Sequence, residues 1–116
     1  MTYEIEESYA FECDVDDVLT YLIDQLKAPR AASQLLDELK NAFECLQENP
    51  FLHAVSRRPI LHMYGCREYL VKNYVIVYKV EGSLVSLLGF YHQRQLYELR
   101  FLDRGVYPRV VKPKEE

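Results

Sequence analysis

The segment REYLVKNYVIVYKVEGSLVSLLGFYHQRQLY, residues 67–97, decides the fold of this chain. It reads as three short strands separated by two turn candidates, Lys72-Asn73 and Glu81-Gly82-Ser83, because Asn, Gly and Ser favour tight turns. β-Branched and aromatic residues fill the middle strand, Tyr74–Tyr78, as is typical of buried strands. The segment therefore predicts a buried sheet whose ends carry polar residues.

Two amphipathic helices are predicted ahead of this sheet. The first is capped at Asp14 or Asp16, and its apolar residues recur at spacings of 3-1-3-1-3 from Val15 to Leu26, which makes one helical stripe. The second begins near Pro29, and Asn49-Pro50 ends it. Because only a few residues join the helices, we expect them to be antiparallel neighbours that pack on one face of the sheet.

The remaining segments complete a single domain, residues 1–116. Tyr3–Glu6 alternates apolar and polar residues, as a half-buried strand does. Residues 51–59 read as a loop, residues 60–66 are ambiguous between a strand and an irregular segment, and a short mixed segment covers 98–103. The order β-α-α-β-β-β predicts an α+β fold with a mainly antiparallel sheet.

Charge is divided unevenly along the chain. The 116 residues carry a net charge of −4, but residues 1–56 hold 12 acidic and 3 basic residues, whereas residues 57–116 hold 6 acidic and 11 basic residues. Such a division indicates either a surface that faces a polyanion or two faces of one domain that neutralise each other.

The sequence also indicates the compartment and the redox state of the cysteines. No apolar run approaches the roughly 20 residues that span a bilayer, and the acidic start is unlike a signal peptide, so we expect a cytoplasmic protein without a membrane partner. The three cysteines have no metal-ligand spacing, which predicts packed, reduced thiols.

The ordered set of segments resembles the RelE/ParE family of toxins from type II toxin–antitoxin systems. Ala31-Ala32, followed by spaced leucines up to Glu48-Asn49-Pro50, is similar to the second helix of the family. Arg67–Val80 resembles its strand pair, R-x-y-x-x-x-n-Y-x-I-x-Y-x-V, and Val85–Arg94 is similar to its last strand with an H-x-R ending. The resemblance covers nearly the whole chain.

This resemblance implies one of two activities. RelE-like members cleave mRNA on the ribosome without a metal or cofactor, whereas ParE-like members block DNA gyrase and have no agreed catalytic residues. Both are neutralised by a cognate antitoxin, so a heterocomplex is expected. We take ribosome-dependent mRNA cleavage as the preferred interpretation, and a gyrase inhibitor or a degenerate partner-binding relative as the alternatives.

Metal-free RNA cleavage requires groups that move protons and cations that stabilise the phosphorane. The candidate catalytic residues are Arg67, His92, Arg94 and Tyr97, and the candidate RNA contacts are Arg57, Arg58 and Lys79. Each also has a plain structural explanation: Arg67 could pair with an acid, His92 and Arg94 could lie on the surface, and Tyr97 could be core. His53 and His62 are given no site role.

The register of the sheet decides whether Arg67 and His92 can share a site. A two-residue turn at Lys72-Asn73 pairs Arg67 with Tyr78. At the second turn, a two-residue Glu81-Gly82 loop would place His92 on the opposite face, and a three-residue Glu81-Gly82-Ser83 loop would place it on the same face. We predict the three-residue loop. Against a nuclease, the chain is acidic overall, whereas RelE-like nucleases are strongly basic.

Overall fold

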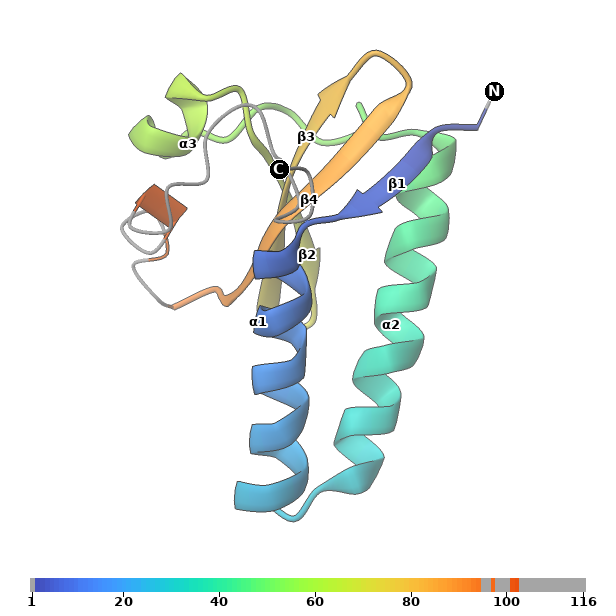
Figure 1. Ribbon diagram of the computed structural model, residues 1–116, viewed down its shortest axis with the longest axis vertical. Coiled ribbons are helices and arrows are strands. Elements are labelled where there is room, and N and C mark those ends of the chain that lie inside the picture. Colours follow the sequence, from blue (N-terminus) through green and yellow to red (C-terminus); the bar gives the residue numbers. More distant parts are fainter. Residues whose placement is uncertain (1, 95–96, 98–100, 103–116) are drawn as a thin grey trace.

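The computed structural model describes residues 2–94, 97, 101 and 102. Its elements are β1 (Glu4–Glu7), α1 (Tyr9–Thr20), the π-helical turn η1 (Tyr21–Gln25), α2 (Pro29–Glu48), α3 (Pro59–Met63), β2 (Arg67–Val71), β3 (Tyr74–Glu81) and β4 (Leu84–His92). The strands form one sheet in the order β1-β4-β3-β2, with β1 parallel to β4 and the other pairs antiparallel (Figure 1). The predicted α+β fold is confirmed.

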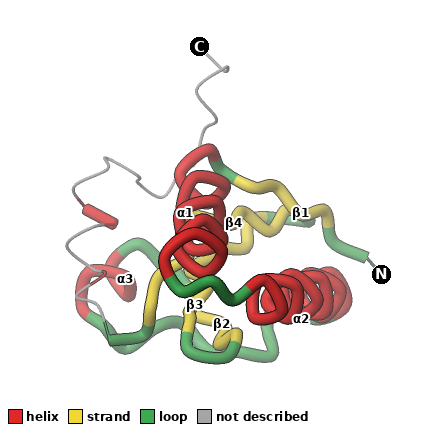
Figure 2. Tube along the Cα trace, turned by 90° about the horizontal axis from the view of Figure 1, so that it is seen from below, coloured by secondary structure: helices red, strands yellow, loops and turns green. Residues whose placement is uncertain are grey.

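Each face of the sheet carries its own core. On one face, α1 and α2 lie side by side (Figure 2). Phe11, Leu35 and Leu46 pack there against Ile76 and Phe90 of the sheet. The opposite face is covered by α3 and by two aromatic residues that follow β4. Its buried cluster consists of Leu61, Cys66, Val75, Val77, Leu88, Tyr91, Tyr97 and Phe101. Neither face of the central strands is left to water.

The first helix begins earlier than predicted. Ser8 has an extended backbone and its Oγ accepts a hydrogen bond from the amide of Phe11 at 3.1 Å, so Ser8 is the N-cap rather than Asp14 or Asp16. Asp14 instead lies inside the helix, 4% exposed, and its Oδ2 accepts from the amide of Phe90 at 3.0 Å. The Asp14 carboxylate thereby provides a hydrogen-bond acceptor for a backbone amide of β4 that lies beyond the residues paired with β1.

The π-helical turn changes the apolar stripe of the first helix. A π turn holds an extra residue, so side chains within it and after it rotate away from the face that they would otherwise occupy. Ile23 and Leu26, predicted as the end of the buried stripe, are 46% and 53% exposed. Figure 1 shows the end of the helix hairpin that carries them protruding beyond the sheet.

The segment that the sequence left ambiguous contains a short helix. Pro59 occupies the first turn of α3, where a missing amide costs nothing. The carbonyl of Leu61 then accepts from the amide of Cys66 at 2.9 Å and leads the chain into β2. Within the predicted segment 98–103, residues 98–100 and 103 lie outside the described residues.

One of the two hairpin turns has the predicted length and the other does not. Lys72-Asn73 is a two-residue turn, with Lys72 at a φ of 55°, and Arg67 pairs with Tyr78 as predicted. The second turn is also two residues, Gly82-Ser83, so the predicted three-residue loop is wrong. His92 nevertheless lies on the face of Arg67, because a β-bulge inserts Leu88 opposite the step between Val77 and Tyr78.

Two further properties complete the description. Cys13, Cys45 and Cys66 are all free thiols, and burial raises the pKa of Cys66 to about 11 despite the nearby Lys79 ammonium. None of the described helices combines the length and the apolar character that crossing a membrane requires.

Replacing Tyr78 by phenylalanine should lower stability at neutral pH and flatten the alkaline limb of the stability curve. The phenol donates to the carbonyl of Pro50 at 2.7 Å, and burial raises its pKa to about 12. Without this donor the buried carbonyl of Pro50 loses its hydrogen bond to Tyr78, and the free energy of unfolding falls by about 1–3 kcal/mol.

The alkaline effect has a defined sign. Below pH 10 both the folded and the unfolded chain keep the Tyr78 proton, so the contribution is complete. Between about pH 10 and 12 only the unfolded chain loses it, so stability falls by roughly 1.4 kcal/mol per pH unit. Urea unfolding from pH 7 to 12 should therefore show the two proteins converging above pH 10. Parallel curves would contradict the assignment.

Candidate functional site

Arg67 and His92 share a face of the sheet but do not lie close together. Their pairing partners on β3, Tyr78 and Tyr74, are four residues apart. This corresponds to about 13 Å along the strand, with two interstrand spacings of about 4.8 Å across the sheet. The two side chains therefore have no common reacting centre in this structure.

Arg67 holds the loop that follows α2. Its Nη1 donates to the carbonyl of His53 at 2.6 Å, and its guanidinium lies 5.0 Å from the centroid of the Phe51 ring. Val55 also forms an isolated bridge with Arg67. Through these contacts the side chain and backbone of Arg67 support the 51–55 segment.

His92 is the last residue of β4, and Arg94 lies in the turn that follows it. The Nδ1 of His92 accepts from the backbone amide of Arg94 at 3.1 Å, which places the ring proton on Nε2. The ring meets Tyr74 edge-on, with centroids 5.4 Å apart. The side chain of Arg94 is exposed. His92 is therefore oriented by its neighbours on β3 and β4.

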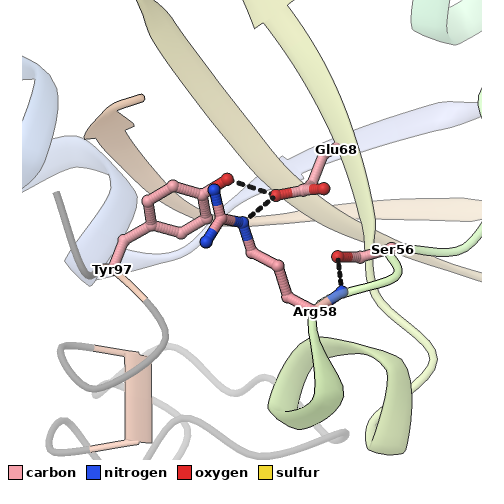
Figure 3. A network of polar contacts seen from close by, with 4 residues as sticks. All are labelled: Ser56, Arg58, Glu68 and Tyr97. Carbon is pink, nitrogen blue, oxygen red and sulfur yellow. Dashed lines mark hydrogen bonds and ion pairs between the residues drawn. The ribbon is translucent and has the colours of Figure 1, made fainter. Parts of the chain in front are cut away.

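Two other predicted residues, Arg58 and Tyr97, meet on the opposite face of the sheet. Figure 3 shows both of them converging on Glu68, a β2 residue that points away from the helices. The hydroxyl of Tyr97 donates to Oε2 of Glu68, and Nε of Arg58 lies 3.3 Å from the same oxygen. The amide of Arg58 donates to Oγ of the buried Ser56 at 3.1 Å. The Glu68 carboxylate thus links the start of α3, strand β2 and Tyr97, which follows β4 in the chain.

Stacking fixes the position of the Tyr97 ring. It lies parallel to the Tyr91 ring, with centroids 5.3 Å apart and an interplanar angle of 6°, and the Arg58 guanidinium covers it at 4.3 Å. Burial and, second, the hydrogen bond to Glu68 raise the pKa of Tyr97 above its usual range. The phenol therefore keeps its proton at neutral pH and acts as a donor.

The remaining predicted RNA contacts lie apart from this cluster. Lys79 donates from Nζ to the carbonyl of Tyr64 at 2.8 Å and lies 3.9 Å from Glu81, so it caps the end of α3. Arg57 is exposed in the loop before α3. A basic track along the sheet is not formed by these side chains.

An open cleft of about 480 Å³ adjoins the Arg58–Glu68–Tyr97 cluster. His53, Leu70 and Gln93 also line it. The cleft offers hydrogen-bond donors and apolar surface, but its guanidinium is already neutralised by Glu68. Among the described residues, no group of three or more His, Cys, Asp or Glu side chains is placed to hold a metal.

Sequence reasoning did not identify Glu68 or His53 as site residues. The alternation of β2 carried a usable signal for Glu68, since a residue next to Arg67 in a strand must point to the opposite face. His53 had no such signal, because it lies in a loop whose path depends on the contact with Arg67.

The chain matches a family model and a solved structure. The model describes the "ParE toxin of type II toxin-antitoxin system, parDE", and it matches residues 6–97. The structure, "Chromosomal ParDE TA system from P. aeruginosa", superposes with a TM-score of 0.63 at 16% identity and covers 78% of this chain and 96% of its own. At that identity the similarity concerns the fold. No curated protein matches the sequence.

Proposed function

Because this chain belongs to the ParE toxin family of type II toxin–antitoxin systems, we propose that it acts as a non-enzymatic inhibitor of DNA gyrase and that a cognate antitoxin neutralises it. Residues 1–116 would form a single toxin domain that acts in the cytoplasm, where gyrase is found. The observation that carries this proposal is the exposed apolar end of the helix hairpin.

The hairpin tip, defined as Ile23 and Leu26, has the character of a contact surface. Both side chains are about half exposed, although neither is needed to close the core. Ile23 lies in the π-helical turn η1 and Leu26 directly follows it, and such turns often mark functional sites. Exposed apolar groups gathered at a protruding end favour docking onto another protein.

The arrangement of the predicted catalytic residues supports a nuclease less well. A metal-free ribonuclease needs a proton-transferring group and a phosphate-binding cation within reach of one phosphodiester. Here Arg67 and His92 are separated along the sheet, and Arg58 and Tyr97 are bound to Glu68 on its other face. The catalytic roles of Arg67, His92, Arg94 and Tyr97 stay predictions, and so does the RNA contact of Arg58.

The charge distribution fits the same proposal. The helix hairpin belongs to the acidic half of the chain, 12 acidic against 3 basic residues, and would be repelled by RNA. A protein target is not excluded by this charge. An antitoxin with basic side chains would in addition be attracted to this half.

Two assays with the purified chain test the proposal. We expect it to inhibit the ATP-dependent supercoiling of relaxed plasmid by gyrase in a concentration-dependent way, and to leave mRNA intact in a translating cell extract. The matched control is the same chain preincubated with the protein encoded by the adjacent reading frame. Cleavage of mRNA together with unaffected supercoiling would overturn the proposal and favour the RelE-like activity.

A further inference from the structure

A second pocket, of about 280 Å³, lies between the end of the first helix and the ends of β3 and β4. Its walls combine aromatic rings with carboxylates from α1. The lining residues that matter here are Asp14, Asp17, Tyr21, Tyr74, Phe90 and His92. The pocket lies on the helix-covered face, away from the Arg58–Glu68–Tyr97 cluster.

Three rings form a continuous aromatic wall. Tyr74 stacks on Phe90, with centroids 5.1 Å apart and an interplanar angle of 21°, and meets His92 edge-on. Tyr21, 52% exposed, stands at the rim. Tyr21 and Tyr74 both line the pocket. Burial and, second, the proximity of Tyr21 raise the pKa of Tyr74. Such walls bind the flat or cationic part of a ligand through their electron-rich faces.

The described charged groups at this wall are the carboxylates of Asp14 and Asp17. Asp14 and Asp17 are three residues apart, so they lie on one side of α1. Asp14 is buried, whereas Asp17 is exposed, and the described part of the chain places no ion-pair partner on Asp17. Among the residues that the structure describes, neither lysine nor arginine lines the pocket. A cation that enters would gain both aromatic and carboxylate contacts.

The volume of the pocket and the shape of guanidinium favour a single arginine side chain as the ligand. Sites for small molecules have volumes of about 300–1,000 Å³, so 280 Å³ suits one long side chain better than a cofactor. Guanidinium is preferred over ammonium, because it is planar, stacks on rings and donates to carboxylates with two parallel N–H groups.

We propose that this pocket receives an arginine side chain of the antitoxin, with its guanidinium stacked on Tyr74 and paired with Asp17. The inference rests on the proposed pairing of this toxin with an antitoxin, and charge complementarity with the acidic half of the chain supports that occupant. A bound arginine would fasten the partner beside the hairpin tip and hinder the approach of the target.

The first test uses a probe and neither gyrase nor antitoxin. Nα-acetyl-L-arginine N-methylamide is titrated into the full chain, and the ring signals of Tyr21 and Tyr74 are followed by NMR. We expect saturable shifts that the uncharged citrulline analogue does not cause. Asp17→Asn should weaken the binding of the probe about three- to tenfold. Asp16→Asn, an exposed neighbour that does not line the pocket, should leave it unchanged.

The second test measures the complex itself. Asp17→Asn should raise the Kd for the protein encoded by the adjacent reading frame about tenfold, and Asp16→Asn should not. Equal shifts with both probes, or equal effects of the two variants, would overturn the proposal. A chain that binds the arginine probe but leaves gyrase active would instead refute the proposed target alone.

Discussion

Replacing Ile23 and Leu26 together by serine should abolish the toxicity of the chain on induction. If both side chains anchor the target, their loss costs about 2–4 kcal/mol and weakens binding roughly 30- to 1,000-fold. Because both are about half exposed, the free energy of unfolding should change by less than about 1 kcal/mol. Growth after induction and inhibition of supercoiling by the purified variant measure the first effect, and urea unfolding measures the second.

The matched control for this variant is Leu36→Ser. Leu36 is 50% exposed on α2, so this variant removes exposed apolar surface from the same helix pair at a distance from the tip, about half as much as the double variant. We expect this variant to remain toxic. A double variant at Ile23 and Leu26 that stops growth as effectively as the parent would show that the tip is not the target surface.

Gly89→Ala should destabilise the fold by about 1–3 kcal/mol, the usual cost of overpacking. A Cβ built at Gly89 would lie 2.5 Å from Cζ and Cε2 of Tyr91, whose ring folds back over the glycine. That ring cannot swing away freely, because it is 1% exposed and stacked on Tyr97. The displaced stack should also loosen the contact between Tyr97 and Glu68.

The glycine in the turn between β3 and β4 provides a contrast. Gly82 has a φ of 61° in the two-residue turn, and no atom lies within 4 Å of a Cβ built there. Gly82→Asn should therefore cost less than about 1 kcal/mol, because Asn tolerates the left-handed region in such turns. Urea unfolding of both variants separates the two effects. Equal destabilisation would mean that crowding by Tyr91 is not the reason for glycine at position 89.

Local patterns predicted most of the fold. The helical stripe of α2, the Lys72-Asn73 turn and the pairing of Arg67 with Tyr78 all follow from spacing and turn chemistry. The same patterns missed the bulge at Leu88, since an inserted residue in a uniformly apolar strand leaves no trace in the order of residue types. Two differences from prediction, a shorter turn and an extra residue, compensated each other and left His92 on the expected face.

The candidate site was less accessible to sequence reasoning. Tyr97 and Arg58 are far apart in the chain, and they meet at Glu68 only in the folded protein. The exposure of Ile23 and Leu26 depends on a π-helical turn, which the apolar spacing alone does not distinguish from an ordinary helical turn. Both features depend on tertiary contacts rather than on local propensity.

The parallel pairing of β1 with β4 sets the time at which a newly made chain can fold. Glu4 pairs with Leu84, so the N-terminal strand has no neighbour in the sheet until the last strand has been synthesised. At about 5–20 residues per second, a ribosome needs roughly 4–17 s to reach that point. During those seconds the nascent chain lacks the pair of β1 and β4, and products that are terminated before β4 never form it. Translation thereby gives the cell a short interval between starting each toxin molecule and having to neutralise it.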